Sequence, residues 1–581
     1  MGKRSQEPDD PIRSRPSSPT DGANDRVLEA WIAPGLTPGF EELRSLASEV
    51  PDHLNAVRYK TVMPCPWVVF VGGTGTGKST LFNALCEKNL SLVGVERPKT
   101  IGPVAYAHVH CPIEAPFPFP EVYPERQASS STQPHSGEPG KLVVLEHRRE
   151  DLAHLVLVDS PDLDSVEEKN RVIARKLALL ADVIVFVTSQ EKYADEAPSI
   201  FLRHLLDEEK VVYGLLNKAD EGFTSHGAVD LLKTQGVIVE EDRLWLVPRI
   251  PDPSWKTLGG QPGFRAFRDR FGSDLSPERA ALLREQLLRA DSKRLAARLS
   301  RLETLIQDEE DACREWIKQL RDLCRKTCSD LVASEQEQFA SKNRARIQKE
   351  IRRLFSRYDP LARPRRAIRN ALRVPLRLIG LGTDRLHERQ GPIRKSPQPA
   401  DMSPVLAALD RFHGGVLERL SPADSRAPLH AALRAPGVSL SPAEVEARLN
   451  AERQSLEAWL EQTFDDLRKG LPTAKKWSIY STSAVWGVLI LSLEATLGGG
   501  FGVIDAVLDS ALAPFITKGS AELFAYREIR AVAREMAARY RQGLFNILEE
   551  QQKRYEDALQ SVRTPSSTLE HVSGLQQEFA P

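Results

Sequence analysis

One short glycine-rich segment constrains this chain more than any other feature of its sequence. From Val68 to Thr80 the chain reads VVFVGGTGTGKST, an apolar run that leads into G-x-x-x-x-G-K-S. Glycines let backbone N–H groups wrap a phosphate because no Cβ atom stands in the way. An apolar helical stretch, Leu81 to Cys86, follows, and the positive end of its dipole would face the phosphates. Strand, loop and helix together predict a nucleoside triphosphate site, whereas a chance glycine-rich turn would lack these flanks.

The residue types of this loop assign roles to individual side chains. Lys78 is expected to reach the β- and γ-phosphates, and Ser79 is expected to bind Mg²⁺. The loop residues expected to contact the nucleotide are Gly72, Gly73, Thr74, Gly75, Thr76, Gly77, Lys78, Ser79 and Thr80. The loop by itself does not select the base of the nucleotide.

Short apolar runs, mostly separated by stretches long enough for a helix, surround this loop. Such alternation predicts strands buried on both faces by crossover helices. We therefore expect an α/β domain, a mostly parallel sheet with flanking helices, over residues 61–272. The runs are Trp67–Val71, Val104–Val109, Leu142–Leu145, Leu155–Val158, Val183–Val187 and Val211–Leu216. One stretch, 112–140, is dense in Pro, Ser and Gly and predicts an inserted exposed loop.

Beyond the α/β region the pattern becomes helical. Ser276-Pro277-Glu278 is typical of a helix start, with Ser as the N-cap and Pro at the first helical position. Apolar residues then recur at spacings of three, four and seven, which predicts long amphipathic helices in a large all-α domain. The expected segments are a disordered tail (1–25), an N-terminal helical segment (26–60), a long helical segment (273–358), a basic Pro/Gly-rich linker (359–403), a helical region (404–470), an apolar helical hairpin (471–520), a C-terminal helix (521–562) and a loosely structured tail (563–581).

Charge and cysteine content exclude several classes of protein. Lys and Arg number 79 against 80 Asp and Glu, a formal net charge of −1. This balance argues against a nucleic-acid binder that relies on bulk positive charge and against an acidic disordered protein. None of the six Cys forms a C-x-x-C pair, which favours a reduced cytosolic chain without a cysteine zinc site.

Two further motifs bear on the base and the metal. Asn217-Lys218-Ala219-Asp220 directly follows an apolar run. An Asp there can accept hydrogen bonds from guanine N1 and the exocyclic amine, a donor pair that adenine lacks, so this motif predicts GTP. Asp159 ends another run and is expected to hold Mg²⁺ through water. Thr100 is the candidate switch threonine that closes on Mg²⁺ and the γ-phosphate, with an ordinary loop threonine as the alternative. We thus expect Lys78, Thr100 and Asp159 to serve the reaction, and Ser79, Thr100 and Asp159 to hold the metal.

In this order the motifs resemble the translation-factor-related class of P-loop GTPases, over about Trp67 to Phe271. The resemblance implies binding of GTP with Mg²⁺, hydrolysis to GDP, and switch loops that order around the γ-phosphate.

The sequence departs from this class at two neighbouring positions and at the fifth motif. Asp162 stands where the family pattern D-x-x-G has Gly, and Leu163 stands where many members have the Gln that orients the attacking water. Asp162 adds negative charge close to the γ-phosphate unless it turns away or meets a cation. Because Leu163 cannot orient water, hydrolysis by the monomer is expected to be slow, and dimerisation or a partner is expected to stimulate it. No base-contacting Ser-Ala pair is recognisable around Leu246-Val247-Pro248-Arg249.

Residues 159–164, the missing Gln and the large helical part together resemble bacterial dynamin-like GTPases more than ribosome-assembly GTPases. The resemblance implies helices that flank the G domain and a lipid-contacting tip on the helical part. From the missing Gln we expect a homodimer through the G domain.

Two segments bear on contact with a membrane. Residues 363–379 interleave Arg with apolar residues and contain no acid, which suits anionic headgroups. A solvated cationic face, or a segment that binds acidic helices or RNA phosphates, is the alternative. The run from Trp477 to Leu493 carries no charge, and three glycines separate it from a second apolar stretch that ends at Ile516. Residues 477–516 predict a helical hairpin that either dips into one leaflet or forms the buried centre of a bundle.

These observations predict a Mg²⁺-dependent GTP-binding protein that hydrolyses GTP to GDP and couples its nucleotide state to a helical domain in contact with a membrane. We expect it to be cytoplasmic, peripheral at or inserted in the cytoplasmic membrane, without a specific nucleic-acid partner. The alternative is a soluble regulatory GTPase switch that acts on the ribosome, RNA or a protein partner.

Overall fold

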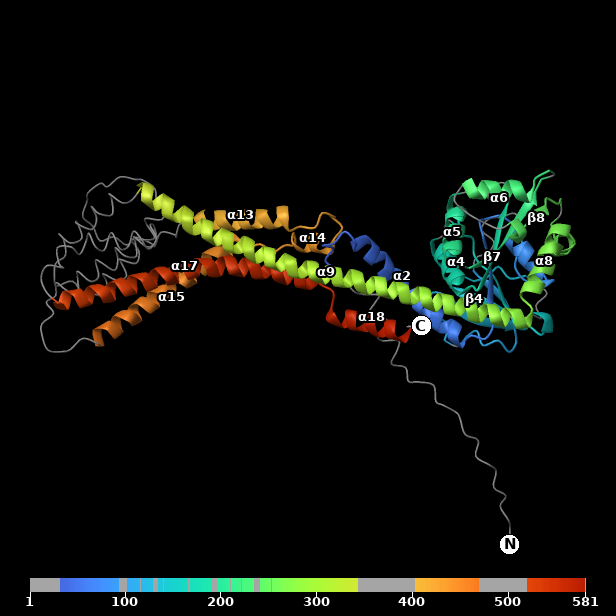
Figure 1. Cartoon of the computed structure of the whole chain (residues 1–581), viewed down its shortest axis with the longest axis horizontal. Helices are drawn as coiled ribbons and strands as arrows, with labels where there is room; N and C mark the ends of the chain where they lie inside the picture. The colour runs from blue at the N-terminus through green and yellow to red at the C-terminus, as the bar shows by residue number, and fades with distance from the viewer. Residues whose placement is uncertain are drawn as a thin grey trace, which may run out of the picture. The chain divides into compact units, whose positions relative to one another are not determined.

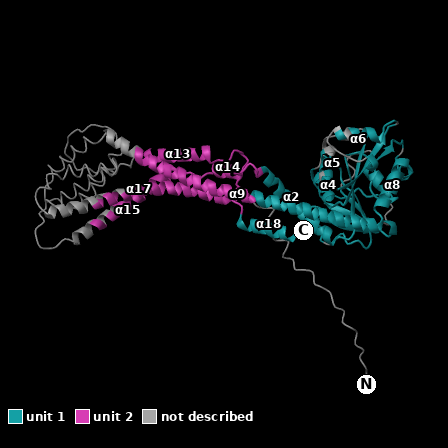
Figure 2. Ribbon diagram, in the orientation of Figure 1, with its two compact units in different colours: residues 1–31, 41–305, 565–581 teal, residues 32–40, 306–564 magenta. Residues whose placement is uncertain are grey.

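A computed structural model describes residues 32–93, 102–114, 116–128, 134–138, 140–165, 168–189, 196–208, 210–220, 222–234, 241–251, 253–342, 403–469 and 520–579. The chain divides into two compact units (Figure 2). Unit 1 comprises residues 1–31, 41–305 and 565–581, and unit 2 comprises residues 32–40 and 306–564.

Unit 1 is built around an eight-stranded sheet in the order β3-β4-β2-β5-β1-β6-β7-β8. The strands are β1 (Trp67–Gly72), β2 (Val104–His108), β3 (Tyr123–Ala128), β4 (Lys141–His147), β5 (Val156–Asp159), β6 (Val183–Ser189), β7 (Val211–Ala219) and β8 (Leu244–Pro248). Every neighbouring pair is parallel except β2 with β5. Each of the six apolar runs is a strand, and the prediction of a mostly parallel sheet is confirmed.

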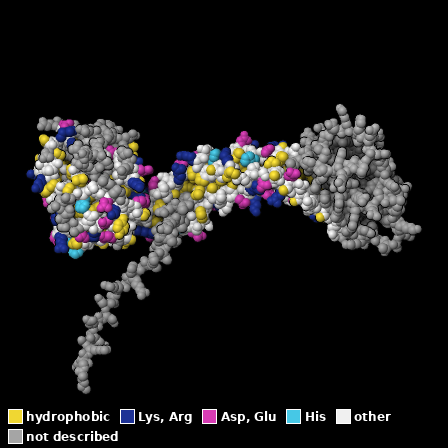
Figure 3. Space-filling model, turned by 180° about the vertical axis from the view of Figure 1, so that it is seen from behind, with side chains coloured by type: hydrophobic (Ala, Val, Ile, Leu, Met, Phe, Trp, Pro, Cys, Tyr) yellow, Lys and Arg dark blue, Asp and Glu magenta, His cyan; other side chains and the backbone are white. Residues whose placement is uncertain are grey.

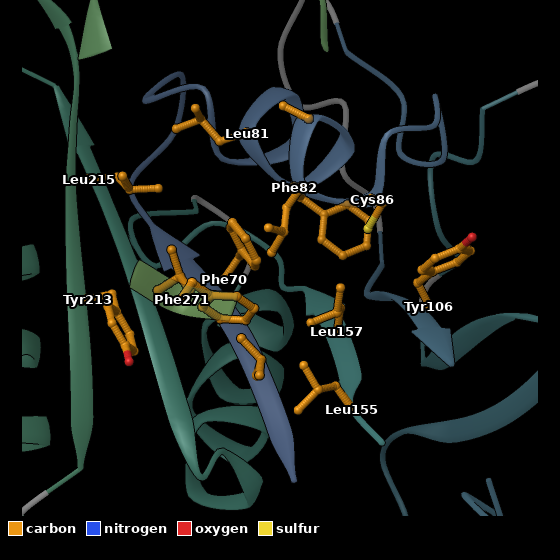
Figure 4. Packing of buried hydrophobic residues seen from close by; sticks show 14 of the residues in the cluster. Phe70, Leu81, Phe82, Cys86, Tyr106, Leu155, Leu157, Tyr213, Leu215 and Phe271 are labelled. Atoms are coloured by element: carbon orange, nitrogen blue, oxygen red, sulfur yellow. The ribbon is translucent and has the colours of Figure 1, made fainter. Parts of the chain in front are cut away.

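Alternate residues of β1 pack on opposite faces of this sheet. The surrounding helices are α3 (Lys78–Cys86), α4 (Glu168–Leu180), α5 (Glu196–Asp207), α6 (Ser225–Thr234), α7 (Trp255–Gly259) and α8 (Pro262–Asp274); α4 and α8 lie on opposite sides of it in Figure 1. Val69 packs in a cluster with Leu177 of α4. Phe70 packs in the other cluster with Phe82 of α3 and Phe271 of α8 (Figure 4). Because side chains alternate along a strand, a strand covered on both faces must be apolar throughout, as β1 is.

One strand lies in the region expected to be an exposed loop. Within 112–140, β3 pairs in parallel with β4 at one edge of the sheet. The sequence YPERQA lacks an apolar pattern because an edge strand needs neither two buried faces nor two hydrogen-bonding sides. Arg126 of β3 instead pairs with Glu146 of β4 at 2.9 Å. The strand is therefore held by its backbone ladder and by ion pairs, which its local sequence does not show.

A buried cluster of charges joins two helices to the starts of β6 and β7. The helices are α2 (Phe40–Val62) and the first part of α9 (Pro277–Lys342). The Lys60 ammonium lies 2.8 Å from Asp291 and 3.2 Å from Asp182, and Lys210 donates to the backbone oxygen of Ala181 at 3.0 Å and lies 3.6 Å from Asp291. Burial and the nearby Lys60 lower the pKa of Lys210 to about 8. Although burial opposes its charge, Lys210 and Lys60 hold the pKa of Asp291 below its usual range.

Helices are the only regular elements among the described residues of unit 2, as expected for the large helical region. It contains the rest of α9 with α13 (Ser403–Arg419), α14 (Pro428–Ala432), α15 (Pro442–Lys469) and α17 (Ser520–Val562). Phe412 of α13 and Tyr555 of α17 pack edge to face in its core, with ring centroids 5.6 Å apart. Trp316 of α9 is buried beside them and donates its indole N–H to the backbone oxygen of Leu420 at 2.7 Å. Figure 3 shows side chains of both charges interspersed over the described surface.

The C-terminal residues 563–581 differ from the expected loose tail. They contain α18 (Ser566–Glu578), which belongs to unit 1. Val572 and Leu575 are buried, and Ser573 donates to Glu303 at 2.6 Å. A helix this short carries only a weak periodic signal and is stabilised mainly by its tertiary contacts.

Several predicted segments lie outside the described residues. They are the tail 1–25, Thr100, nearly all of the linker 359–403 with its basic part 363–379, and nearly all of the hairpin region 471–520 with its apolar part 477–516. Within the described ranges, none of the helices combines the length and apolar content that crossing a bilayer requires.

The buried charge cluster generates a test of stability. Asp291→Ala leaves Lys60 and Lys210 buried without one of their shared anions, so we expect a destabilisation of about 3–5 kcal/mol. The measurement is the shift of the urea unfolding midpoint, followed by circular dichroism. Glu285→Ala is the matched control on the same helix, because its partner Arg289 and its own side chain are largely exposed. Equal shifts for the two variants would contradict a stabilising role for the cluster.

Candidate functional site

The phosphate loop, residues 72–79, joins β1 to α3 at the carboxyl edge of the sheet. Its backbone requires glycine at three points. Gly75 and Gly77 have φ angles of 75° and 91°, in the region that other residues rarely adopt. A Cβ atom on Gly77 would lie 2.2 Å from the Asn217 amide nitrogen, and one on Gly72 would lie 2.1 Å from the Val187 backbone oxygen. The motif glycines therefore serve both the turn of the loop and its close approach to β6 and β7.

The first two residues of the N-K-x-D motif fasten this loop. Asn217 is buried at the end of β7 and donates its amide N–H to the backbone oxygen of Thr76 at 2.9 Å. Lys218 donates to the backbone oxygen of Gly75 at 2.6 Å. Thr76 in turn donates its hydroxyl to the backbone oxygen of Gly73 at 2.9 Å. The two motifs, far apart in the sequence, thus form one hydrogen-bonded unit.

Asp220, the residue expected to read guanine, directly follows β7 with its side chain 59% exposed. The guanidinium of Arg249 lies 3.3 Å from its carboxylate. The backbone N–H of Arg249 donates to the backbone oxygen of Ala219 at 2.9 Å. Arg249 therefore adjoins the base-reading position, a role that sequence reasoning missed. Its place directly after β8, the neighbour of β7, is the one signal that could have indicated it.

Asp159 lies fully buried at the end of β5, beside the start of α3. One carboxylate oxygen, Oδ2, accepts a hydrogen bond from Ser91 at 2.6 Å. The other, Oδ1, is buried and has no hydrogen-bond partner among the residues that the structure describes; it lies 3.9 Å from the Lys78 ammonium. Burial raises the pKa of Asp159, while the Lys78 ammonium and the nearby Ser79 and Ser91 side chains oppose that rise. An unsatisfied carboxylate oxygen near the Ser79 hydroxyl fits a hydrated Mg²⁺ ion.

Ser91 is a second site residue that sequence reasoning missed. Asn83 of α3 holds it: the Asn83 side chain accepts from the Ser91 backbone N–H at 2.8 Å and donates to the Ser91 backbone oxygen at 2.7 Å. Ser91 thereby binds one carboxylate oxygen of Asp159, while Lys78 lies nearest to the other. The short polar stretch around it carries no motif, because its place is set by a side chain of the preceding helix.

Two acids after β5 contact the phosphate loop. Asp162 accepts from the Lys78 ammonium at 2.9 Å, so this departure from the family pattern meets a cation, one of the two alternatives left open by the sequence. Asp164 accepts from both the backbone N–H and the hydroxyl of Thr74, at 2.6 and 2.7 Å. Leu163 between them packs against the apolar cluster on the α4 face of the sheet. Burial opposes the charge on Lys78, yet Asp162 and Asp159 raise its pKa.

The remaining predicted site residues are Ser79, Thr80 and Thr100. Ser79 and Thr80 lie in the first turn of α3, where Thr80 is buried. Thr100 lies outside the described residues. The structure thus brings together the loop, Asn217, Lys218 and Asp159, while Asp220 stands at the exposed end of the same edge.

Comparison with known proteins supports this reading of the domain. Residues 67–218 match the model of a family described as 50S ribosome-binding GTPase. No curated protein is significantly similar in sequence to the chain. The match agrees with the P-loop GTPase domain that the motifs predicted in this part of the chain.

Two solved structures are similar to the chain over a longer span. Both are described as an oligomerised bacterial dynamin pair that provides a mechanism for long-range sensing and tethering of membranes. They are 16% and 14% identical, with TM-scores of 0.28 and 0.27, and the alignments cover 62% of this chain and 68% of each of theirs. The assignment of the domain rests on the family match over residues 67–218.

The position of Asp220 generates a test of base selection. Asp220→Asn replaces one acceptor with a donor, so we expect the affinity for GTP to fall at least about tenfold through the lost pair of charge-assisted hydrogen bonds. Affinity for xanthosine triphosphate should rise, because xanthine carries an oxygen where guanine carries its amine. Fluorescence titration with labelled GTP, and competition by the unlabelled xanthosine and adenosine triphosphates, measures both effects. If the Asp220→Asn variant bound GTP as tightly as the wild type, guanine would not be bound by Asp220.

Proposed function

We propose that this protein is a Mg²⁺-dependent GTP phosphohydrolase, dynamin-like in coupling the nucleotide state of its G domain to its helical part. The observation that carries the hydrolase assignment is the meeting of Lys78, Ser79 and the unsatisfied Asp159 carboxylate oxygen at one sheet edge. This arrangement suits a triphosphate with its metal, because it offers a cation to the phosphates and oxygen ligands to the ion.

In this proposal the residues act chiefly by positioning. The phosphate loop and Lys78 hold the β- and γ-phosphates, while Asp220 selects guanine. Ser79 and Asp159 hold Mg²⁺, with Thr100 as the third group on the metal side. The bound ion would neutralise charge that develops on the phosphate oxygens.

Nothing at position 163 assists the attacking water, because the Leu163 side chain is apolar and packs against the sheet. We therefore propose that turnover by a single molecule is slow. A second G domain, or a protein partner, would supply the missing water-orienting or charge-stabilising group. In other GTPases a group supplied by a second protein raises turnover by about 10³–10⁵-fold.

The coupling proposal rests on α9. Its residue Asp291 belongs to the buried charge cluster at the starts of β6 and β7, and the same helix continues into unit 2. A shift of these strands would therefore act on α9 directly. The proposed membrane contact rests on the sequence of residues 363–379 and 477–516 alone.

A prediction on turnover follows. Hydrolysis of GTP should require Mg²⁺, and the rate per molecule should rise with protein concentration as G domains meet. The measurement is phosphate release over a hundredfold range of protein concentration, with Lys78→Ala as the blank. A high rate that stays constant across this range would refute the need for a second molecule. A rate equal to that of the blank under all conditions would mean that the protein binds nucleotide as a scaffold and does not hydrolyse it.

A second prediction concerns the membrane. The full chain should sediment with anionic liposomes, and deletion of residues 477–516 should abolish this. A variant that neutralises the arginines of 363–379 tests the electrostatic share, which added salt should screen. If neither the full chain nor the deletion variant sediments with liposomes, membrane contact is wrong. The alternative, a regulatory GTPase switch on the ribosome, RNA or a protein partner, then takes its place.

A further inference from the structure

We infer that residues 160–165, here called the post-β5 segment, act as a built-in competitor for the phosphates of the nucleotide. Its two carboxylates, Asp162 and Asp164, occupy groups of the phosphate loop that a triphosphate needs. The inference rests on the proposed function, since it concerns regulation of the same site. It assigns to the two acids a role in setting nucleotide affinity and exchange.

The first contact engages the phosphate-binding cation. The ammonium of Lys78 is only 3% exposed and lies 2.9 Å from the Asp162 carboxylate. A carboxylate oxygen at this distance accepts an N–H group that a phosphate oxygen could otherwise accept, since both are anionic acceptors. Lys78 also lies 3.9 Å from Asp159. Two carboxylates already face this one ammonium, so added phosphate charge must displace the one that is not held in the sheet edge, Asp162.

The second contact engages the backbone of the loop. Asp164 accepts the Thr74 backbone N–H at 2.6 Å, and backbone N–H groups of such a loop are the donors that cradle phosphates. The Asp164 carboxylate would also lie 3.2 Å from a Cβ atom on Gly73. Cation and loop backbone are thus both engaged by one short stretch of chain.

Backbone hydrogen bonds hold this stretch in place. Ser160 donates its backbone N–H to the backbone oxygen of Phe70 at 3.2 Å, and Leu163 donates to that of Gly72 at 3.1 Å. The next helix holds the far end, because Arg171 of α4 donates to the backbone oxygen of Ser165 at 2.8 Å. Displacement of the two acids would therefore strain or break the hydrogen bond between α4 and Ser165. The segment links occupancy of the phosphate site to the position of that helix.

A triphosphate can still displace the two carboxylates, because it binds several donors of the loop and Mg²⁺ at once. Each carboxylate, by contrast, occupies only one or two of these donors. The competition lowers affinity and speeds release. The wild-type protein should consequently exchange nucleotide by itself.

The test compares variants that keep shape and remove charge. Asp162→Asn and Asp164→Asn are isosteric, and Asp162→Gly restores the usual residue of the family pattern. Stopped-flow fluorescence with a labelled GTP analogue and Mg²⁺ gives the dissociation constant and release rate. We expect Asp162→Asn and Asp162→Gly to bind GTP about tenfold more tightly and to release it more slowly, and Asp164→Asn to shift both quantities in the same direction.

Asp242→Asn is the matched control, because it removes one acid from the same domain just before β8, at the opposite edge of the sheet. Circular dichroism checks the fold of each variant. Wild-type affinity in all three site variants, or weaker binding, overturns the inference while the proposed function stands. If the wild type and every variant bind no better than Lys78→Ala, the proposed function fails and the inference falls with it. Binding by Asp162→Asn but not by the wild type supports a competitor that dominates the site.

Discussion

A buried ammonium group needs an anion beside it, and the organisation of this G domain follows from that need at Lys78. The side chain is nearly inaccessible and sits between Asp159 and Asp162. Moving a charge out of water is unfavourable unless an opposite charge replaces the lost hydration. The state described here meets the need internally, with carboxylates, and the phosphates of a nucleotide would meet it in the loaded state. On the competitor role inferred above, the residues that follow β5 would move when a nucleotide binds.

A second buried charge centre lies at the opposite edge of the same sheet. Lys60, Lys210 and Asp291 meet where β6 and β7 begin, and Asn217 holds the phosphate loop where β7 ends. One strand, β7, thus runs from the charge cluster to the nucleotide site. Since separating one partner from a buried ion pair leaves an uncompensated buried charge, a displacement of α9 from the sheet at this cluster is unfavourable. This provides the physical basis for the proposed coupling between the G domain and its helices.

Much of the G domain followed from sequence patterns because its interactions are local or repetitive. Six strands appeared as apolar runs, since a strand buried on both faces has no room for polar residues. The glycines of the phosphate loop were recognisable because few other residues tolerate their backbone angles. The two edge strands, β3 and β8, and the short helix α18 were not among the predicted elements; contacts with distant residues stabilise β3 and α18. Ser91 and Arg249 were missed for the same reason, since each acts through a partner on another element.

The sequence by itself predicted the chemistry of the site: which groups would bind phosphate, which acid would face the metal, and which acid would read guanine. Spacing and residue type suffice for these, because each follows from the donors and acceptors that a nucleotide presents. Only the tertiary structure decided how those groups are partnered when they face one another. The sequence left open whether Asp162 turns away or meets a cation, and the answer depends on a distance of 2.9 Å to Lys78. Electrostatic energy depends on the separation and burial of the charges, and neither quantity can be derived from the order of residues along the chain.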